Sequence, residues 1–259
     1  MRLLSLNLWG GMVHEPLLEF LKQQQQSIDI FCFQEVFSAL PGAPKESAGA
    51  RMFLFNELES LLTDFMGFFD SRSTGRDFKG DVNFPVSHGL AVFVRKNLGA
   101  IGYRGEILEE SKSSRDPVEG WTKAQVLTLT TDDKEFSLIN FHGVGQPGNK
   151  LDTPQRLGHM QKLALIWESL KGRPRILCGD FNLYPQTESI KIMESLGENL
   201  IKKYNIQNTR NEMSWKKYAD SPQHFADYTF VSSSIQVKNF EVPYNEVSDH
   251  LPMIVDFSL

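Results

Sequence analysis

The stretch Arg175-Ile176-Leu177-Cys178-Gly179-Asp180-Phe181-Asn182 carries the clearest structural signal in the chain. Its apolar run predicts a buried strand. Asp180 and Asn182 follow two positions apart, so their side chains leave the backbone on the same side. This pair has two interpretations: an Asx-turn, or a carboxylate and an amide held at a sheet edge for chemistry. The rest of the chain has to decide between them.

The composition of the 259-residue chain is that of a globular protein, with 41% hydrophobic and 23% charged residues. A net charge of −5 argues against duplex binding through a broad basic face. Cys32 and Cys178 lie in apolar runs and are predicted to be buried, reduced thiols. The N-terminus is too short for a signal-peptide apolar region, and no run reaches membrane-spanning length. We therefore expect a cytoplasmic protein without a membrane anchor.

The order of predicted elements favours strands interrupted by a few helices. Strands are predicted at 2–7, 28–33, 89–95, 101–109, 121–130, 136–141, 175–179, 225–232, 235–242 and 251–257. Helices are predicted at 16–26, 51–65, 153–171 and 188–196, and loops at 38–50, 71–87 and 143–152. No linker or repeat divides the chain. We predict one domain over 1–259, in which two mainly antiparallel sheets pack together with helices outside.

Polar side chains accompany the ends of several predicted strands. They are Asn7, Gln34-Glu35, His142, Asp180 with Asn182, Asp227, and Asp249-His250 just before the last strand. Independent turns do not easily explain so many polar strand ends. The Asp180 stretch is therefore interpreted as part of a site.

The set contains what metal-assisted hydrolysis of a phosphate ester requires. Glu35 and Asp249 are hard oxygen ligands of the kind that suits Mg²⁺. Asp180 can orient or deprotonate an attacking water, and Asp227 can hold His250 in position.

The remaining members suit contacts with the substrate phosphate. Asn7 and Asn182 offer neutral amide donors to phosphoryl oxygens. His142 and His250 can donate a hydrogen bond or a proton to the phosphate.

The ordered motifs resemble those of the endonuclease/exonuclease/phosphatase family, which has the DNase I-like fold. The resemblance covers residues 3–257 and rests on these motifs in order: Asn7, Gln34-Glu35, Asn140-Phe141-His142, Gly179-Asp180-Phe181-Asn182, Asp227-Tyr228 and Ser248-Asp249-His250. It implies a four-layer α/β/β/α sandwich with the site at one edge of the paired sheets. It also implies a Mg²⁺-dependent hydrolase, with Mn²⁺ as a substitute, that cleaves a P–O bond by in-line attack of water.

The resemblance also implies roles for single residues. Glu35 corresponds to the principal metal ligand and Asp180 to the residue assigned to the nucleophilic water. His250 corresponds to the histidine that contacts the scissile phosphate, and Asp227 to its carboxylate partner.

Two positions depart from the family pattern. Trp9 stands where some nuclease members have an acidic residue, which leaves Glu35 and Asp249 as the expected metal pair. Phe225 stands where many members have a basic residue. Any phosphate contact or packing role of that basic residue is therefore not carried over to this chain.

Other polar residues are interpreted as structural or solvated. His14, His88, His159 and His224 lack a matching motif and are expected in the core or on the surface. The cations of the second loop, Arg72, Arg76 and Lys79, are expected in solvent, although a substrate-phosphate role stays open. Arg156 is expected at the surface, and Trp9 in the core or a pocket wall.

The shared motifs do not assign the substrate. We favour a phosphodiester of nucleic acid or nucleotide type, such as a nucleic-acid end. The alternatives are a sphingomyelinase-like lipid hydrolase, an inositol-phosphate phosphatase, or a non-catalytic interaction module of the same fold. The sequence gives no signal for oligomeric state.

Overall fold

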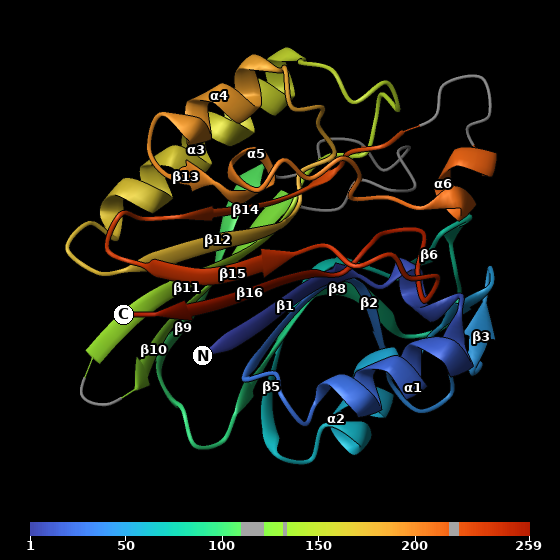
Figure 1. Cartoon of the computed structure of the whole chain (residues 1–259). Helices are drawn as coiled ribbons and strands as arrows, with labels where there is room; N and C mark the ends of the chain where they lie inside the picture. The colour runs from blue at the N-terminus through green and yellow to red at the C-terminus, as the bar shows by residue number, and fades with distance from the viewer. Residues whose placement is uncertain (110–121, 132–133, 218–222) are drawn as a thin grey trace.

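The computed structural model describes residues 1–109, 122–131, 134–217 and 223–259 (Figure 1). Residue 121, the predicted start of one strand, lies outside these ranges. Within them, no helix is long and apolar enough to cross a membrane.

Two six-stranded sheets form the centre of the molecule. The first sheet has the order β15 (Gln236–Glu241), β16 (Met253–Ser258), β1 (Arg2–Asn7), β2 (Ile30–Ala39), β8 (Val86–Arg95) and β5 (Phe65–Thr74). The second has the order β13 (Glu198–Asn199), β14 (Asp227–Val231), β12 (Arg175–Asp180), β11 (Lys134–His142), β10 (Thr122–Thr131) and β9 (Gly99–Glu109). Most neighbours are antiparallel, but β1–β2 and β11–β12 are parallel.

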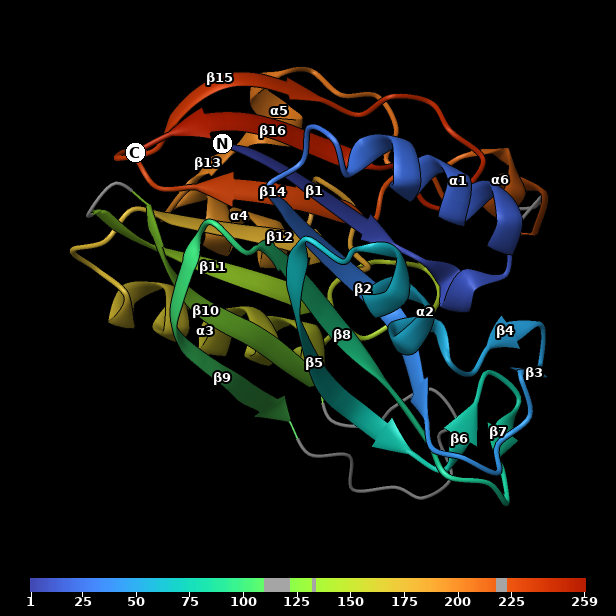
Figure 2. The same cartoon turned by 90° about the horizontal axis from the view of Figure 1, so that it is seen from below.

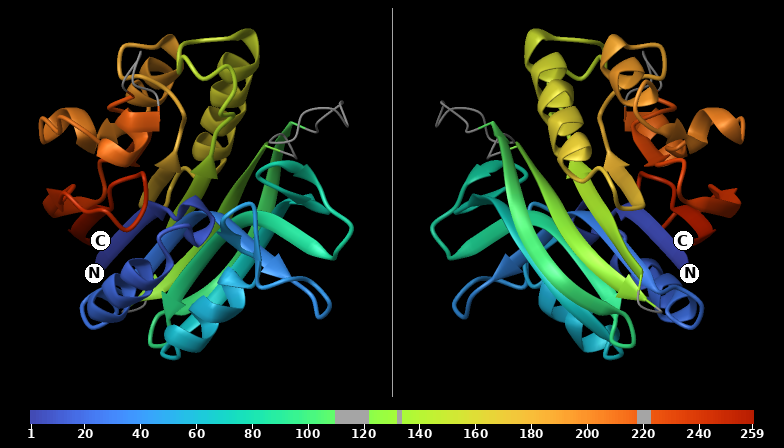
Figure 3. Two further views of the ribbon diagram at one scale, coloured as in Figure 1. Left: turned by 90° about the vertical axis from the view of Figure 1, so that its right-hand side faces the viewer. Right: turned by 90° about the vertical axis from the view of Figure 1, so that its left-hand side faces the viewer.

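Helices cover the outer faces of the two sheets (Figures 1 and 2). On the first sheet lie α1 (His14–Gln24) and α2 (Leu54–Leu61); on the second lie α3 (Pro154–Ser169), α4 (Glu188–Glu194) and α5 (Leu200–Lys203). The side views in Figure 3 show the resulting layers. The predicted sandwich of two mainly antiparallel sheets flanked by helices is confirmed.

Short elements surround one end of the sandwich. They are η1 (Trp9–Gly11), the strand pairs β3 (Glu46–Ser47) with β4 (Ala50–Arg51) and β6 (Arg76–Asp77) with β7 (Gly80–Asp81), and α6 (Glu212–Lys217).

Apolar side chains fill the space between the layers. One cluster joins both sheets, with Cys32, Val92, Phe141 and Cys178 fully buried. A second cluster lies between the first sheet and its helices, where Leu17 and Leu58 pack. Both cysteines are buried free thiols, as predicted.

The region around β2 and β5 corrects the predicted boundaries. β2 does not end at Phe33 but continues through Glu35 to Ala39, with a change of register between Phe33 and Val36. The second predicted helix ends at Leu61, and β5 begins at Phe65 and runs into the predicted loop 71–87. Gly67, two residues after the predicted end of that helix at residue 65, is not a helix stop. It lies in β5, where a Cβ would come within 2.9 Å of the Phe93 ring.

Candidate active site

Strand pairing brings the polar strand ends together. His142 pairs with Asp180 at the end of the parallel β11–β12 pair, and Asp180 pairs with Asp227 on β14. In the other sheet, Asn7 pairs with Gln34 at the end of the parallel β1–β2 pair. A cleft of about 580 Å³ opens over these ends.

Asp180 is the centre of the cluster. Asn7 Nδ2 donates to Asp180 Oδ2 over 3.0 Å, and the Nε2 atoms of His142 and His250 lie 3.6 and 3.7 Å from the same oxygen. Burial alone would raise the pKa of Asp180, but His250, His142 and Lys150 together hold it well below the usual range. Asp180 is therefore an ionised acceptor at neutral pH.

His250 is held by the Asp227 carboxylate. Its Nδ1 lies 2.9 Å from both carboxylate oxygens of Asp227, which leaves Nε2 directed at Asp180 and Asp249. Burial by itself lowers the pKa of His250, but the Asp227, Asp249 and Asp180 carboxylates together outweigh it and the pKa is raised. The ring is thus available as an imidazolium that donates from Nε2.

Glu35 reaches the cleft because the strand that carries it is irregular. The change of register at this point of β2 is a bulge, and Glu35 has the left-handed φ of 56°. Bulges re-aim side chains, and a non-glycine residue in this region is costly unless the surroundings impose it. Glu35 Oε1 lies 3.8 Å from His142 Nε2.

The acidic groups fit a divalent metal ion. Glu35, His142 and Asp180 offer ligand atoms that all lie within 4.8 Å of one another. Burial raises the pKa of Glu35, and the nearby Asp249 carboxylate raises it further, which indicates a cluster short of positive charge. Asp249 Oδ1 is buried without a hydrogen-bond partner among the described residues. Oxygen atoms of this kind suit a hard cation such as Mg²⁺.

Besides its expected role as a metal ligand, Asp249 forms an ion pair that was not predicted. Its Oδ2 forms an ion pair with Arg210, which lies just before α6 in an isolated β-bridge to His250, and both residues of the pair are buried. One carboxylate oxygen is therefore committed to the protein, and only Oδ1 is available to a metal.

The Gly179–Asn182 stretch is fixed by its neighbours. Gly179 is required because a Cβ there would lie 2.0 Å from the Phe141 carbonyl oxygen. Phe181 is buried against Phe141, Tyr228 and Phe230, as predicted. Asn182 adopts a φ of 54° and donates its backbone N–H to Asp180 Oδ1 over 2.9 Å. The Asx-turn and the site are thus the same structure.

Several cleft residues were missed or misplaced from sequence. Arg72 was expected in solvent but is buried and lines the cleft, because β5 extends past residue 71. Trp9 lines the cleft, as the pocket-wall interpretation expected. Lys150 and Gln223 also line it, and neither was singled out. The unusual glycine content of 143–152 was the only sequence signal for Lys150.

Arg156 is the other misplaced arginine. It is 2% exposed and donates to the carbonyl oxygens of Val144, Gly145, Pro147 and Leu151. These bonds hold the loop 143–152 over the cleft.

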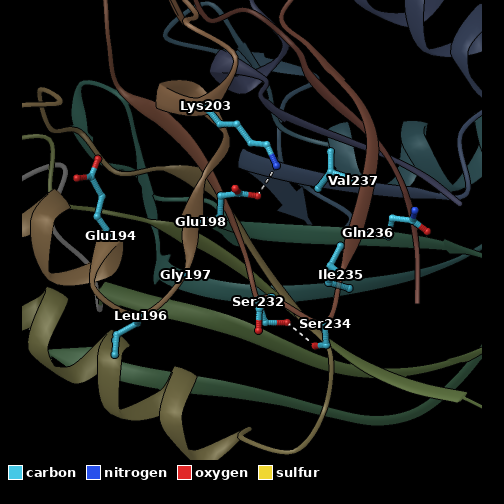
Figure 4. A pocket seen from close by; sticks show the side chains of 11 residues that line it. Glu194, Leu196, Gly197, Glu198, Lys203, Ser232, Ser234, Ile235, Gln236 and Val237 are labelled. Carbon is cyan, nitrogen blue, oxygen red and sulfur yellow. Dashed lines mark hydrogen bonds and ion pairs between the residues drawn. The ribbon is translucent and has the colours of Figure 1, made fainter.

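A second cavity, of about 750 Å³, lies away from this cluster, beside β13 and β15 (Figure 4). Glu198 pairs with Lys203 over 2.7 Å, and Ser232 and Ser234 bond to each other over 2.9 Å. Its polar groups satisfy one another, so it offers no comparable set of reactive groups.

The two packed sheets and the cluster of carboxylates and histidines at their edge are features of a known family. The model of the Endonuclease/Exonuclease/phosphatase family matches residues 4–250, and the chain belongs to this family. Its members are generally metal-dependent hydrolases of phosphoesters. No curated protein matches the chain in sequence.

Several solved structures share this fold. The human nocturnin catalytic domain is 21% identical, with a TM-score of 0.71 over 100% of this chain and 93% of that one. A mannosyl-6-phosphatase from Bacteroides thetaiotaomicron is 18% identical, with a TM-score of 0.71 over 100% of both chains. A humanized TDP2 from D. rerio is 12% identical, with a TM-score of 0.68 over 100% of this chain and 99% of that one. These identities establish the fold and leave the substrate open.

Proposed function

We propose that this protein is a Mg²⁺-dependent phosphoesterase that hydrolyses a phosphodiester of nucleotide or nucleic-acid-end type by in-line attack of water. The observation that carries the proposal is the convergence of Asn7, His142 and the Asp227–His250 pair on one oxygen of the buried, ionised Asp180.

The chain's own groups have complementary roles. Asp180 orients the attacking water as an ionised hydrogen-bond acceptor, because its low pKa keeps it charged at neutral pH. It is also the nearest candidate to receive the proton that the water loses. His250 donates from Nε2 to a phosphoryl oxygen, and Asp227 fixes the ring through Nδ1. Asn7 and Asn182 are amide donors beside this point, and His142 adds a ring nitrogen.

A metal would be held by Glu35 and by the unpartnered Oδ1 of Asp249, with Mn²⁺ able to replace Mg²⁺. When bound, it would polarise the phosphoryl oxygen and offset the charge of the carboxylates.

The cleft supports a small or single-stranded substrate. Its volume of about 580 Å³ is in the range of small-molecule sites. Trp9, Met12 and Phe78 line it alongside the charged cluster, and such apolar surfaces can stack a base. A nucleotide combines a phosphoester with a planar base, so it uses both parts.

The proposal is tested with bis(p-nitrophenyl) phosphate in the presence of Mg²⁺. We expect hydrolysis by the wild type, inhibition by EDTA, and a loss of about 10³-fold or more in kcat for Asp180→Asn. Asp64→Asn, at an exposed carboxylate, is the matched control and should retain full activity. Hydrolysis that survives both EDTA and Asp180→Asn would exclude this site.

A substrate panel then separates the alternatives: single- and double-stranded DNA, abasic DNA, RNA, inositol phosphates and sphingomyelin. Preference for inositol phosphates or sphingomyelin would replace the nucleotide assignment. No turnover of any substrate would favour a non-catalytic module.

A further inference from the structure

Lys150 is a buried cation that forms no ion pair with a carboxylate among the described residues. It is 3% exposed and lines the cleft. Its ammonium donates to the amide oxygen of Asn182, and no carboxylate pairs with it among the described residues. A buried charge without a partner is costly and calls for an anion. Burial lowers its pKa to about 8, so it is mainly charged at neutral pH.

Arg210 lies near Lys150, and Gln223 connects the two. Gln223 Oε1 accepts from Arg210 Nη1 over 3.1 Å, and Gln223 Nε2 donates to the Gly148 carbonyl in the loop that carries Lys150. Arg210 is among the groups that lower the pKa of Lys150. Asp249 pairs with Arg210, and the Asp180 carboxylate partly offsets the lowering of the Lys150 pKa. Arg210 Nε is nevertheless buried without a hydrogen-bond partner among the described residues, so the two cations together still offer donors to an anion.

The contacts of these cations involve different carboxylate oxygens from those that the histidines face. His142 and His250 face Asp180 Oδ2, whereas Asn182, the partner of Lys150, is bonded to Asp180 Oδ1. In the same way, His250 faces Asp249 Oδ1, whereas Arg210 binds Asp249 Oδ2.

Both cations line the same cleft as the catalytic cluster, and Arg210 forms an isolated β-bridge with His250, so the cation site adjoins the point of hydrolysis. We propose that Lys150 and Arg210 bind a second phosphate group of the substrate, next to the one that is hydrolysed. This rests on the proposed function only in calling the ligand a substrate; binding of a second phosphate can be measured without turnover.

The first test measures binding of inorganic pyrophosphate in EDTA by calorimetry, so that neither metal nor catalysis is needed. We expect Lys150→Met to weaken binding by about 10- to 100-fold, the usual effect of losing a charge-assisted contact. Lys171→Met removes an exposed lysine and should leave the affinity unchanged. Equal affinity of the wild type and Lys150→Met would overturn the proposal.

A second variant distinguishes the loss of a specific contact from misfolding of Lys150→Met. Gln223→Glu keeps both cations but places a carboxylate between them, and it should weaken pyrophosphate binding as strongly as Lys150→Met. If Gln223→Glu folds, as judged by its thermal transition, and binds pyrophosphate as well as the wild type, the site is not between these cations.

Turnover then identifies the source of the second phosphate. A dinucleotide with a terminal phosphate at either end is compared with the same dinucleotide without it, and a hexose bisphosphate with the monophosphate. We expect one doubly phosphorylated compound to have a KM about 10- to 100-fold lower than its partner, and Lys150→Met to remove that difference. If only the hexose bisphosphate is preferred over its monophosphate, the second-phosphate subsite is supported and the substrate is a sugar phosphate.

The two proposals fail in different ways. Lys150-dependent pyrophosphate binding without hydrolysis of any ester would reject the phosphoesterase and keep the subsite. Hydrolysis with no preference within either pair would reject the subsite and keep the phosphoesterase. A Lys150-dependent preference for p-nitrophenyl phosphate over the diester would place the second charge on the scissile phosphate and reject the subsite.

Discussion

The two sides of the cleft differ in how their charges are balanced. Around Asp180, the Asp227–His250 pair and the Asn7 amide satisfy the carboxylate oxygens within the protein. On the other side, Lys150 has an amide oxygen as its partner and Arg210 shares Asp249 with the expected metal. The first side is a preorganised catalytic arrangement, whereas the second gains its full set of partners only when a ligand binds. Three variants test this difference.

The largest effect is expected from Asp227→Asn on the preorganised side. Loss of the carboxylate that orients His250 should lower kcat by about 10³-fold or more, measured with the diester that the wild type hydrolyses. The raised pKa of His250 depends on Asp227, so the decline of activity with rising pH should begin at lower pH in the variant.

The same pairing affects stability with a defined sign. Because the pKa of His250 is higher in the folded protein, its contribution is fully present below the unfolded value of about 6.5. It is lost as the pH rises through the folded value. An unchanged pH profile of kcat in Asp227→Asn would mean that the pair does not control the ring.

A smaller effect is expected from Glu35→Gln, which tests the metal site between the two sides. The affinity for Mg²⁺ should fall by about 100-fold or more. Mg²⁺ at about 100 times its dissociation constant stabilises a protein by about 2.7 kcal/mol, and thermal unfolding should show that the variant loses most of this gain. Glu59→Gln, at an exposed glutamate, should keep it. The same gain in both variants would place the metal elsewhere.

The smallest effect is expected from Lys150→Met on the unbalanced side, and here the protein should become more stable. The lowered pKa of Lys150 implies a cost of about 1–3 kcal/mol for burying the charge at pH 7. Removing the charge should raise the free energy of unfolding by up to that amount.

The pH dependence of this gain has a clear sign. Wild-type Lys150 loses its proton in the folded state near pH 8 but in the unfolded chain only near 10.4. Wild-type stability therefore rises between these values, and the advantage of the variant should shrink there. Denaturant unfolding at pH 7 and pH 10 measures the gain in stability of Lys150→Met and its decrease with pH, with Lys171→Met as the control. A destabilised variant at pH 7 would show that Lys150 is satisfied without a ligand.

The sequence predicted the sandwich and its layers because the strands are short apolar runs separated by turn residues. Six of the predicted strand-end positions could be named for the same reason: Asn7, His142, Asp180, Asn182, Asp227 and His250 follow strict alternation or a recognisable motif. Glu35 lines the cleft as expected, but it lies inside β2 and not at the end of a strand. The bulge that allows this is not visible in a single sequence.

The other side of the cleft was not predictable in this way. Lys150, Arg210 and Gln223 lie outside the regular elements, and their meeting depends on loop conformation. The predictions that Arg72 and Arg156 are exposed were wrong, because burial of an arginine depends on tertiary partners that no local pattern encodes. The one-domain prediction and the catalytic roles stay predictions.

The position of β1 has a consequence for how the protein is made. This strand lies between β2, which follows it closely in the chain, and β16, which is separated from it by more than two hundred residues. During synthesis, the β16 side of β1 stays an open edge until residues 253–258 have left the ribosome. Ser248, whose hydroxyl donates to the Asn7 carbonyl over 2.7 Å, precedes that strand. Nascent chains should therefore acquire the site only after residues 253–258 have emerged, when β16 pairs with β1 and completes this part of the sheet.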